Sequence, residues 1–363
     1  MNAQPAFSRR QPPRANEPPL RVMIVDDSPV ARAVLSRMIA THGDFEIVAL
    51  AGSAKEALDA LKTIRPDIIL LDIEMPGASG LEALPEIIRQ GRGARVLIVS
   101  SMAEDGAETA IRALASGAAD TLPKPGAGSF GGRFSEVLAD RLRRIGRAER
   151  EAVAETAAAP ETPIPLRAMP EGPLGCLALA ASTGGLHALF EFLPALPKRI
   201  GAPILVTQHL PKIFMTHFAR QLTNACGRQA RVVADGDPID DDVLHVAPGD
   251  AHLCLVQSSD GVRAKLDRKR SVSGCMPSAD PMFASVAKVY GATAVGVVLS
   301  GMGRDGVLGS RQIVDRGGAI LAQDQHSAAI WGMPRAVAQA GLACAIMPPV
   351  ALAHQIAERA SWM

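Results

Sequence analysis

The chain has 363 residues, of which 48% are hydrophobic and 21% charged, a composition that excludes a largely disordered protein and favours two globular domains. Its 38 lysines and arginines nearly balance its 37 acidic residues, so no overall basic field favours nucleic acid or an anionic membrane. We find no apolar run long enough to span a membrane, and the N-terminal stretch does not resemble a signal peptide. The five cysteines are scattered and form no C-x-x-C pair, which disfavours a disulfide framework or a zinc ribbon. We therefore expect a cytoplasmic protein.

The first part of the chain predicts an α/β domain. Residues 1–20 are rich in proline and arginine and are expected to form a disordered tail. From residue 21 to residue 147, short apolar runs alternate with helix-like stretches. The expected strands are 22–25, 46–50, 68–71, 96–99 and 120–122. Continuous apolar strands separated by helices are typical of a doubly wound parallel sheet with helices on both faces.

The second part predicts another α/β domain. Residues 148–173 are rich in Ala, Glu, Arg and Pro and are interpreted as a linker, because proline lacks the N–H that a helix needs. Residues 174–363 resume the alternation. The expected strands are 176–181, 204–207, 231–234, 243–247, 252–256, 294–299 and 319–322. The expected helices are 186–193, 213–225, 282–290, 305–315 and 334–340.

Polar residues follow several strands of the first domain. In an open parallel sheet, functional groups collect beyond the carboxyl ends of the strands, and those positions hold Asp26, Asp27, Asp72, Ser100 and Lys124. Three carboxylates at one edge suit a hard cation such as Mg²⁺, and a carboxylate beside a metal and a lysine can attack phosphorus. Taken singly, each residue is more often a turn or helix-capping residue. The joint pattern favours a site.

Four motifs carry a resemblance across residues 20–147. They are Val-Asp-Asp-Ser (25–28), Leu-Asp-Ile-Glu-Met-Pro (71–76), Val-Ser-Ser (99–101) and Pro-Lys-Pro (123–125). Together they resemble the flavodoxin-like receiver domain of bacterial response regulators. The resemblance implies that a histidine kinase phosphorylates Asp72, that Asp26, Asp27 and Asp72 hold Mg²⁺, and that Ser100 and Lys124 sense the phosphoryl group. Receivers usually have an aromatic residue where Thr121 stands, which predicts a shallower switch.

A serine, a histidine and an aspartate follow three strands of the second domain. Ser182 stands between a strand and a helix, where backbone N–H groups favour negative charge; the same pattern also fits a phosphate-binding turn or a helix cap. His209 and Asp305 each follow another strand, so the three can converge as a triad requires. The chain order Ser, His, Asp and the lack of G-x-S-x-G disfavour an α/β-hydrolase.

The loop around Asp305 also fits a different class of protein. Gly301, Gly303 and Gly306 spell G-x-G-x-x-G, and Asp324 follows the next strand, as in a dinucleotide-binding fingerprint. The motif lies late in its domain, however, and Asp305 would place a carboxylate beside the pyrophosphate. Two further alternatives are a receiver fused to an inactive binding module and a DNA-binding regulator. The intact Ser, His and Asp disfavour the first, and alternating strands and helices disfavour the second.

The second domain resembles the catalytic domain of chemotaxis protein-glutamate methylesterases along almost its whole length. The motifs are Ala-Ser-Thr-Gly-Gly (181–185), Gln-His-Leu-Pro (208–211), Val-Ala-Pro-Gly-Asp-Ala-His-Leu (246–253), Pro-Ser-Ala-Asp (277–280), Leu-Ser-Gly-Met-Gly-Arg-Asp-Gly (299–306), Ala-Gln-Asp (322–324) and Gly-Met-Pro (332–334). The resemblance implies a Rossmann-like three-layer α/β/α domain with Ser182 as nucleophile, His209 as base and Asp305 as its orienting partner. The family mostly has Gly where Ala180 stands, which could shift the serine turn.

The resemblance also implies a substrate and a mode of control. The substrates are γ-glutamyl methyl esters and specific glutamines on the cytoplasmic helices of chemoreceptors, and the enzyme is peripheral to receptor arrays. Backbone groups of Thr183, Gly184 and Met302 are the candidates for binding the oxyanion or the substrate, and no metal is expected at the esterase site. The receiver is expected to cover the serine cleft until a chemotaxis histidine kinase phosphorylates Asp72.

Overall fold

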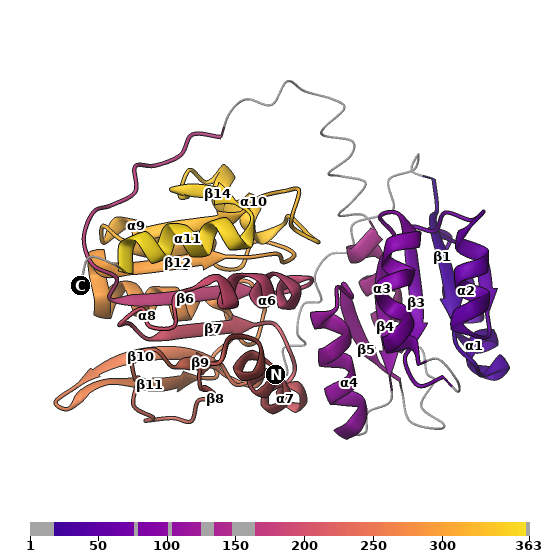
Figure 1. The fold of residues 1–363 in the computed structure, drawn as a ribbon, viewed down its shortest axis with the longest axis horizontal. Coiled ribbons are helices and arrows are strands. Elements are labelled where there is room, and N and C mark those ends of the chain that lie inside the picture. The colour runs from indigo at the N-terminus through magenta and orange to yellow at the C-terminus, as the bar shows by residue number, and fades with distance from the viewer. Residues whose placement is uncertain (1–17, 76–78, 101–103, 125–133, 147–163, 361–363) are drawn as a thin grey trace, which may run out of the picture.

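The computed structural model describes residues 18–75, 79–100, 104–124, 134–146 and 164–360, which form two α/β units (Figure 1). Each unit is built around a parallel sheet with helices on its faces, so the predicted fold class is confirmed. Residues 1–17 and 147–163, which include most of the predicted tail and much of the predicted linker, lie outside the described residues.

The first sheet has the strand order β2-β1-β3-β4-β5. Its strands are β1 (Leu20–Val25), β2 (Phe45–Ala51), β3 (Ile68–Asp72), β4 (Arg95–Ser100) and β5 (Asp120–Pro123). Its helices are α1 (Pro29–Ala40), α2 (Ala54–Leu61), α3 (Gly80–Gly91), α4 (Glu104–Ala115) and a further helix at 134–146. Every residue of β3 is buried, because helices cover the sheet on both sides. The order reverses between β1 and β3, which is where such sheets form their sites.

The second sheet has the order β14-β13-β12-β6-β7-β9-β8, and all its neighbours are parallel. Its strands are β6 (Cys176–Ala181), β7 (Ile204–Gln208), β8 (Ala230–Val232), β9 (Leu244–Val246), β12 (Ala294–Val298), β13 (Ala319–Gln323) and β14 (Ala345–Met347). Its helices are α6 (Gly185–Ala195), α7 (Lys212–Cys226), α8 (Ala279–Tyr290), α9 (Val307–Asp315), α10 (Met333–Gln339) and α11 (Pro349–Ala360), with a 3-10 turn at Gly291–Thr293.

Some elements differ from the expectation. The predicted strand 252–256 is one arm of an antiparallel hairpin, β10 (His252–Ser258) with β11 (Gly261–Asp267), and β11 itself was not predicted. Strand β14 and helix α11 were not predicted either. Asp305 does not open a helix: α9 begins at Val307, after Gly306 has taken a left-handed φ of 89°, so Asp305 stays in the preceding loop and is free to point elsewhere.

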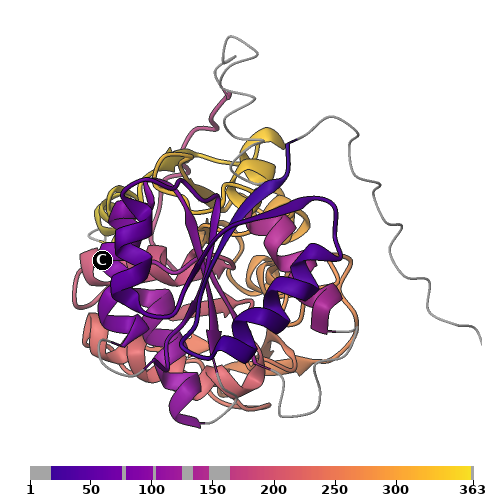
Figure 2. The same ribbon diagram turned by 90° about the vertical axis from the view of Figure 1, so that its right-hand side faces the viewer.

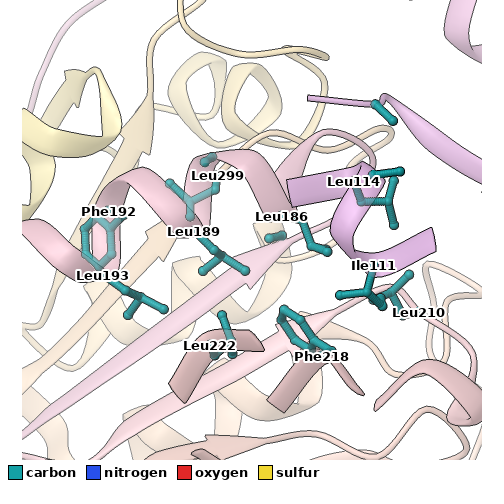
Figure 3. Close-up of a cluster of buried hydrophobic side chains, with 14 of the residues drawn as sticks. Ile111, Leu114, Leu186, Leu189, Phe192, Leu193, Leu210, Phe218, Leu222 and Leu299 are labelled. Carbon is teal, nitrogen blue, oxygen red and sulfur yellow. The ribbon is translucent and has the colours of Figure 1, made fainter. Parts of the chain in front are cut away.

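The first unit packs against the second at the carboxyl end of β6 (Figures 1 and 2). Helix α4 contacts α6 and α7. Figure 3 shows Ile111 and Leu114 of α4 in one apolar cluster with Leu186, Leu210 and Phe218. The Gly184 N–H donates to the Ala119 carbonyl at 3.0 Å, and Glu108 forms an ion pair with Arg220 at 2.6 Å. The contact therefore lies on α6 and α7 and on the loops that lead into them from β6 and β7.

Helices α8 and α9 approach closely at Gly309. A Cβ there would lie 2.6 Å from the Cβ of Phe283 and 2.7 Å from the Asp280 carbonyl oxygen, so Gly309→Ala must push the two helices apart. We expect a loss of about 1–3 kcal/mol in the free energy of unfolding, as for other overpacked cores, measured by urea denaturation. The control is Leu308→Ala, which truncates an exposed neighbour on the same helix and should stay within about 0.5 kcal/mol of wild type. Equal stability of the two variants would contradict the prediction.

Candidate active site and phosphorylation site

The three residues of the predicted triad follow three adjacent strands. Ser182 follows β6, His209 follows β7 and Asp305 lies beyond β12, and β12, β6 and β7 are neighbours at the centre of the second sheet. The sequence Cys-Leu-Ala-Leu-Ala-Ala makes β6 a fully buried strand. Because parallel strands end at the same edge, the three loops converge there.

The three side chains form a hydrogen-bonded chain. His209 Nδ1 lies 3.0 Å from Ser182 Oγ, and His209 Nε2 lies 2.8 Å from Asp305 Oδ2. With the ring proton on Nε2, that nitrogen donates to Asp305 and Nδ1 accepts from the Ser182 hydroxyl. The ring thus faces the serine with Nδ1, whereas the chymotrypsin-type triad uses Nε2 for that contact. The structure therefore brings together Ser182, His209 and Asp305.

Asp305 is buried and has two further donors. The Ser278 hydroxyl donates to Asp305 Oδ1 at 2.6 Å, and the Ala279 N–H donates to Asp305 Oδ2 at 2.7 Å. Ala279 is the first residue of α8, so its N–H lies at a helix N-terminus, where negative charge is favoured. The role of Ser278 was missed, although it stands in the quoted Pro-Ser-Ala-Asp motif; no periodic pattern indicates that it reaches Asp305.

These contacts shift three pKa values. Burial lowers the pKa of His209, but its hydrogen bond to Asp305 and its contact with Cys275 outweigh burial and raise that pKa to about 9. Burial raises the pKa of Asp305, but hydrogen bonds and the charge of His209 hold it well below its usual range. Burial, together with the nearby charge of Asp305, raises the pKa of Asp280 to about 6.

The turn after β6 is held by hydrogen bonds to its backbone and by a close approach of Gly301. The Ser182 N–H donates to the Ser300 carbonyl at 2.9 Å, and Gln208 Nε2 donates to the Ser182 carbonyl at 2.8 Å. A Cβ on Gly301 would lie 2.8 Å from the Cβ of Ser182, so only glycine allows this approach. Ala180 is fully buried in β6.

The candidate oxyanion groups differ in their availability. Within the described part of the chain, the N–H groups of Thr183 and Met302 donate to no protein acceptor. The N–H of Gly184 is occupied, because it donates to Ala119 of the first unit. Of the three candidate N–H groups, Gly184 alone is therefore engaged with a protein acceptor among the described residues.

The first sheet gathers the predicted carboxylates at its own edge. Oxygens of Asp26, Asp27 and Asp72 all lie within 4.8 Å of one another. Lys124 Nζ lies 2.6 Å from Asp72 and 3.0 Å from Asp26. Three close carboxylates, two of them buried, fit a hard divalent cation. The side chain of Ser100 lies outside the described residues.

Two pKa shifts mark this acidic cluster. Burial raises the pKa of Asp72, although Lys124 opposes the shift. Burial lowers the pKa of Lys124, but hydrogen bonds to Asp72 and Asp26 outweigh it, so that pKa is raised. Nearby, Thr121 is buried in β5, and its carbonyl accepts a hydrogen bond from Arg141 at 2.8 Å.

Comparisons with known proteins match both units. The response regulator receiver domain model matches residues 22–129, and the CheB methylesterase model matches residues 177–356. A protein-glutamate methylesterase/protein-glutamine glutaminase 2 of Caulobacter vibrioides is 42% identical over 345 residues, which cover 94% of this chain and 99% of that protein. The chain belongs to the CheB methylesterase family. This membership confirms the resemblance on which the interpretation of both domains was based.

One more sequence relative and one solved structure agree with this assignment. A protein-glutamate methylesterase/protein-glutamine glutaminase of Azospirillum brasilense is 36% identical, over 94% of this chain and 95% of its own. The crystal structure of the Thermotoga maritima CheB methylesterase catalytic domain superposes with a TM-score of 0.50 at 29% identity, covering 52% of this chain and 99% of that domain. Among the helices described here, none has the length and apolar character needed to cross a membrane.

The charge state of His209 is directly measurable. We expect its ring to titrate near pH 9 in an NMR titration of the full chain with a chelator present. Asp305→Asn removes the carboxylate that raises this pKa, so burial should then lower the pKa from about 9 towards the ordinary 6.5, while the effect of Cys275 remains. Because the folded pKa is raised, the charged ring stabilises the folded state below about pH 6.5, and this contribution is lost as the pH rises through the folded pKa.

The matched control is Asp324→Asn, whose carboxylate bonds to Ser327 and not to His209. It should leave the His209 titration in place. An unchanged His209 pKa in Asp305→Asn would contradict the assigned cause.

Proposed function

We propose that this chain is a phosphorylation-activated hydrolase that acts in the sensory adaptation of bacterial chemotaxis. It demethylates γ-glutamyl methyl esters and deamidates specific glutamines on the cytoplasmic helices of chemoreceptors. The observation that carries the proposal is the hydrogen-bonded chain from Ser182 through His209 to Asp305. It lies in a chain whose relatives over nearly their full length are named protein-glutamate methylesterase/protein-glutamine glutaminase.

Acylation begins at the serine. Ser182 Oγ attacks the ester carbonyl while His209 takes the hydroxyl proton on Nδ1, which lies 3.0 Å away. Because the pKa of His209 is raised to about 9, only the neutral fraction of the ring serves as this base, and that fraction grows as the pH rises towards that value. The imidazolium that forms is stabilised by Asp305, which stays ionised at neutral pH because its pKa is depressed. His209 then returns the proton to the methoxy group, and methanol leaves a glutamyl-enzyme.

Deacylation repeats these steps with water. His209 takes a proton from the water as it attacks the acyl carbonyl, then gives the proton back to Ser182, and a glutamate carboxylate is released. A glutamine side chain follows the same path, except that ammonia leaves in the first half. In both halves the N–H groups of Thr183 and Met302 would stabilise the oxyanion. Such donors are worth about 10²–10³ in turnover each.

The receiver is proposed to control access to this site. Asp72 would accept a phosphoryl group from a chemotaxis histidine kinase, with Ser100 and Lys124 contacting its oxygens. Asp26, Asp27 and Asp72 are the residues that would hold Mg²⁺, which supplies positive charge to the phosphoryl transfer. Phosphorylation adds roughly −1.5 to −2 charges at the edge of the sheet whose helix α4 packs on α6 and α7.

Blocking is supported by where the first unit lies. Its Ala119 carbonyl occupies the Gly184 N–H, two residues from Ser182. Its Ile111 and Leu114 pack on Leu186 and Leu210, which follow the serine turn and His209. A receptor helix must reach the same loops, so the two compete for one surface.

Ser182→Ala tests the nucleophile. We expect methanol release from methylated receptor membranes to fall by about 10⁶, as for the serine of other triads, with an unchanged fold by circular dichroism. Ser258→Ala is the control, since that serine lies at the turn of the β10–β11 hairpin and is not a partner of Ser182, His209 or Asp305. Residual activity of Ser182→Ala within tenfold of wild type would rule out the assignment.

Glu108→Arg tests the blocking contact. It replaces the ion pair with Arg220 by a like-charge pair, so we expect the unphosphorylated rate to rise about two- to fivefold, as about 0.5–1 kcal/mol of docking energy is lost. The double variant Glu108→Arg with Arg220→Glu should restore the wild-type rate. Glu86→Arg is the control, because Glu86 pairs with Arg89 on α3.

A small phosphodonor tests whether phosphorylation of Asp72 controls this contact. Acetyl phosphate should activate the wild type and leave Asp72→Asn at its basal rate. A fragment of residues 148–363 that is no faster than the unphosphorylated full chain would contradict blocking. A phosphorylated full chain that clearly outruns the fragment would add a positive contribution from the receiver.

A further inference from the structure

A free cysteine lies inside the candidate active site. Cys275 follows β11 in the loop that leads to α8, and its sulfur lies within 4.8 Å of a ring nitrogen of His209. One ligand atom each from His209, Cys275 and Asp305 lies within 4.8 Å of the other two. The triad mechanism uses His209 and Asp305 but has no step for this thiol.

The loop holds the cysteine in place. The Cys275 carbonyl accepts from the Ser271 hydroxyl at 2.9 Å, and the Cys275 N–H donates to Ser273 Oγ at 3.3 Å. Further along the same segment, Ser278 and Ala279 donate to Asp305. The segment that carries Cys275 therefore also fixes Asp305, while His209 comes from the loop that follows β7.

This donor set differs from the one in the receiver. A thiolate, an imidazole and a carboxylate are the ligands of Zn²⁺, which binds them at about 2.0–2.3 Å and therefore needs them about 3.3–3.8 Å apart. His209 Nε2 and Asp305 Oδ2, now 2.8 Å apart in a hydrogen bond, must separate slightly when the ion replaces the proton between them. Soft sulfur disfavours Mg²⁺, whereas the all-carboxylate cluster at Asp72 favours it. The two residue groups of one chain therefore suit different metals.

We propose that His209, Cys275 and Asp305 form an inhibitory site for Zn²⁺ or a similar soft divalent ion. The ion bonds to Cys275 Sγ, His209 Nε2 and an Asp305 oxygen. The thiol proton and the Nε2 proton of the protonated ring leave to solvent. The remaining ring proton then stays on Nδ1, the nitrogen that faces Ser182, so His209 can no longer accept the serine proton. Ser278 and Ala279 keep their hydrogen bonds to Asp305 and orient it as a ligand.

Cobalt binding tests the site without any assay of activity. The full-length protein is first stripped of transition metals and kept in Mg²⁺. It is then titrated with Co²⁺ and followed by absorption. We expect one equivalent to produce a thiolate-to-cobalt charge-transfer band, which Zn²⁺ abolishes. Cys275→Ser and Cys275→Ala should both lack the band. Cys344→Ser should keep it, because that thiol lies near Ala168. No band in the wild type, or an undiminished band in both Cys275 variants, would overturn the proposal.

Inhibition is the second measurement, and it rests on the proposed function. With buffered free Zn²⁺, the concentration that halves the methanol-release rate should rise at least about tenfold in Cys275→Ser and Cys275→Ala, since a ligand is lost, and a chelator should restore the wild-type rate. Equal zinc sensitivity of wild type and both variants would overturn the inhibitory role. If metal-free wild type hydrolyses no ester, the proposed function fails, and the cobalt titration still decides the site.

Discussion

The ionised carboxylate of Asp305 is the group around which the second unit is organised. An isolated buried charge costs several kcal/mol, so it persists only where donors surround it. Here they are the Ser278 hydroxyl, the Ala279 N–H and the His209 ring. Their combined effect overcomes burial and depresses the pKa of Asp305. The same charge keeps His209 oriented, and His209 in turn meets Ser182.

This requirement accounts for several features of the fold. Helix α8 must begin next to Asp305, because its first N–H is one of the donors. Helix α9 must begin only after Gly306 has turned the chain, because an earlier start would draw Asp305 into the helix. Gly309 then allows α9 to lie against α8, which fixes the distance between the loop of Asp305 and the helix terminus that stabilises it.

Much of this arrangement was predictable from the sequence, and the rest was not for identifiable reasons. Buried strands are recognisable in a sequence as short continuous apolar runs. The positions of Ser182, His209 and Asp305 at strand ends therefore follow from pattern and topology alone. Cys275 and Ser278 stand in an irregular loop after an unpredicted strand, β11, and nothing periodic places them beside a triad. The apolar residues Ile111 and Leu114 have the spacing of a core-facing helix, and no sequence pattern shows that this cluster also includes a second unit.

The two sites have the same position in their sheets but differ in the charge that they present. Both lie where parallel strands end, at the reversal in strand order. At Asp72, three carboxylates face one lysine, Lys124, so the edge keeps a negative charge that suits a cation. Beyond β6, β7 and β12, the charge of Asp305 is balanced by protein donors, and under the proposed function the N–H groups of Thr183 and Met302 would serve an anion that forms only during the reaction. Coupling needs a physical link between the units, and the Ala119 carbonyl on Gly184 is such a link. Ala119 lies just before β5, at the opposite end of that strand from Lys124, so a change at the first edge reaches the serine turn through this hydrogen bond only if it moves β5 as a whole.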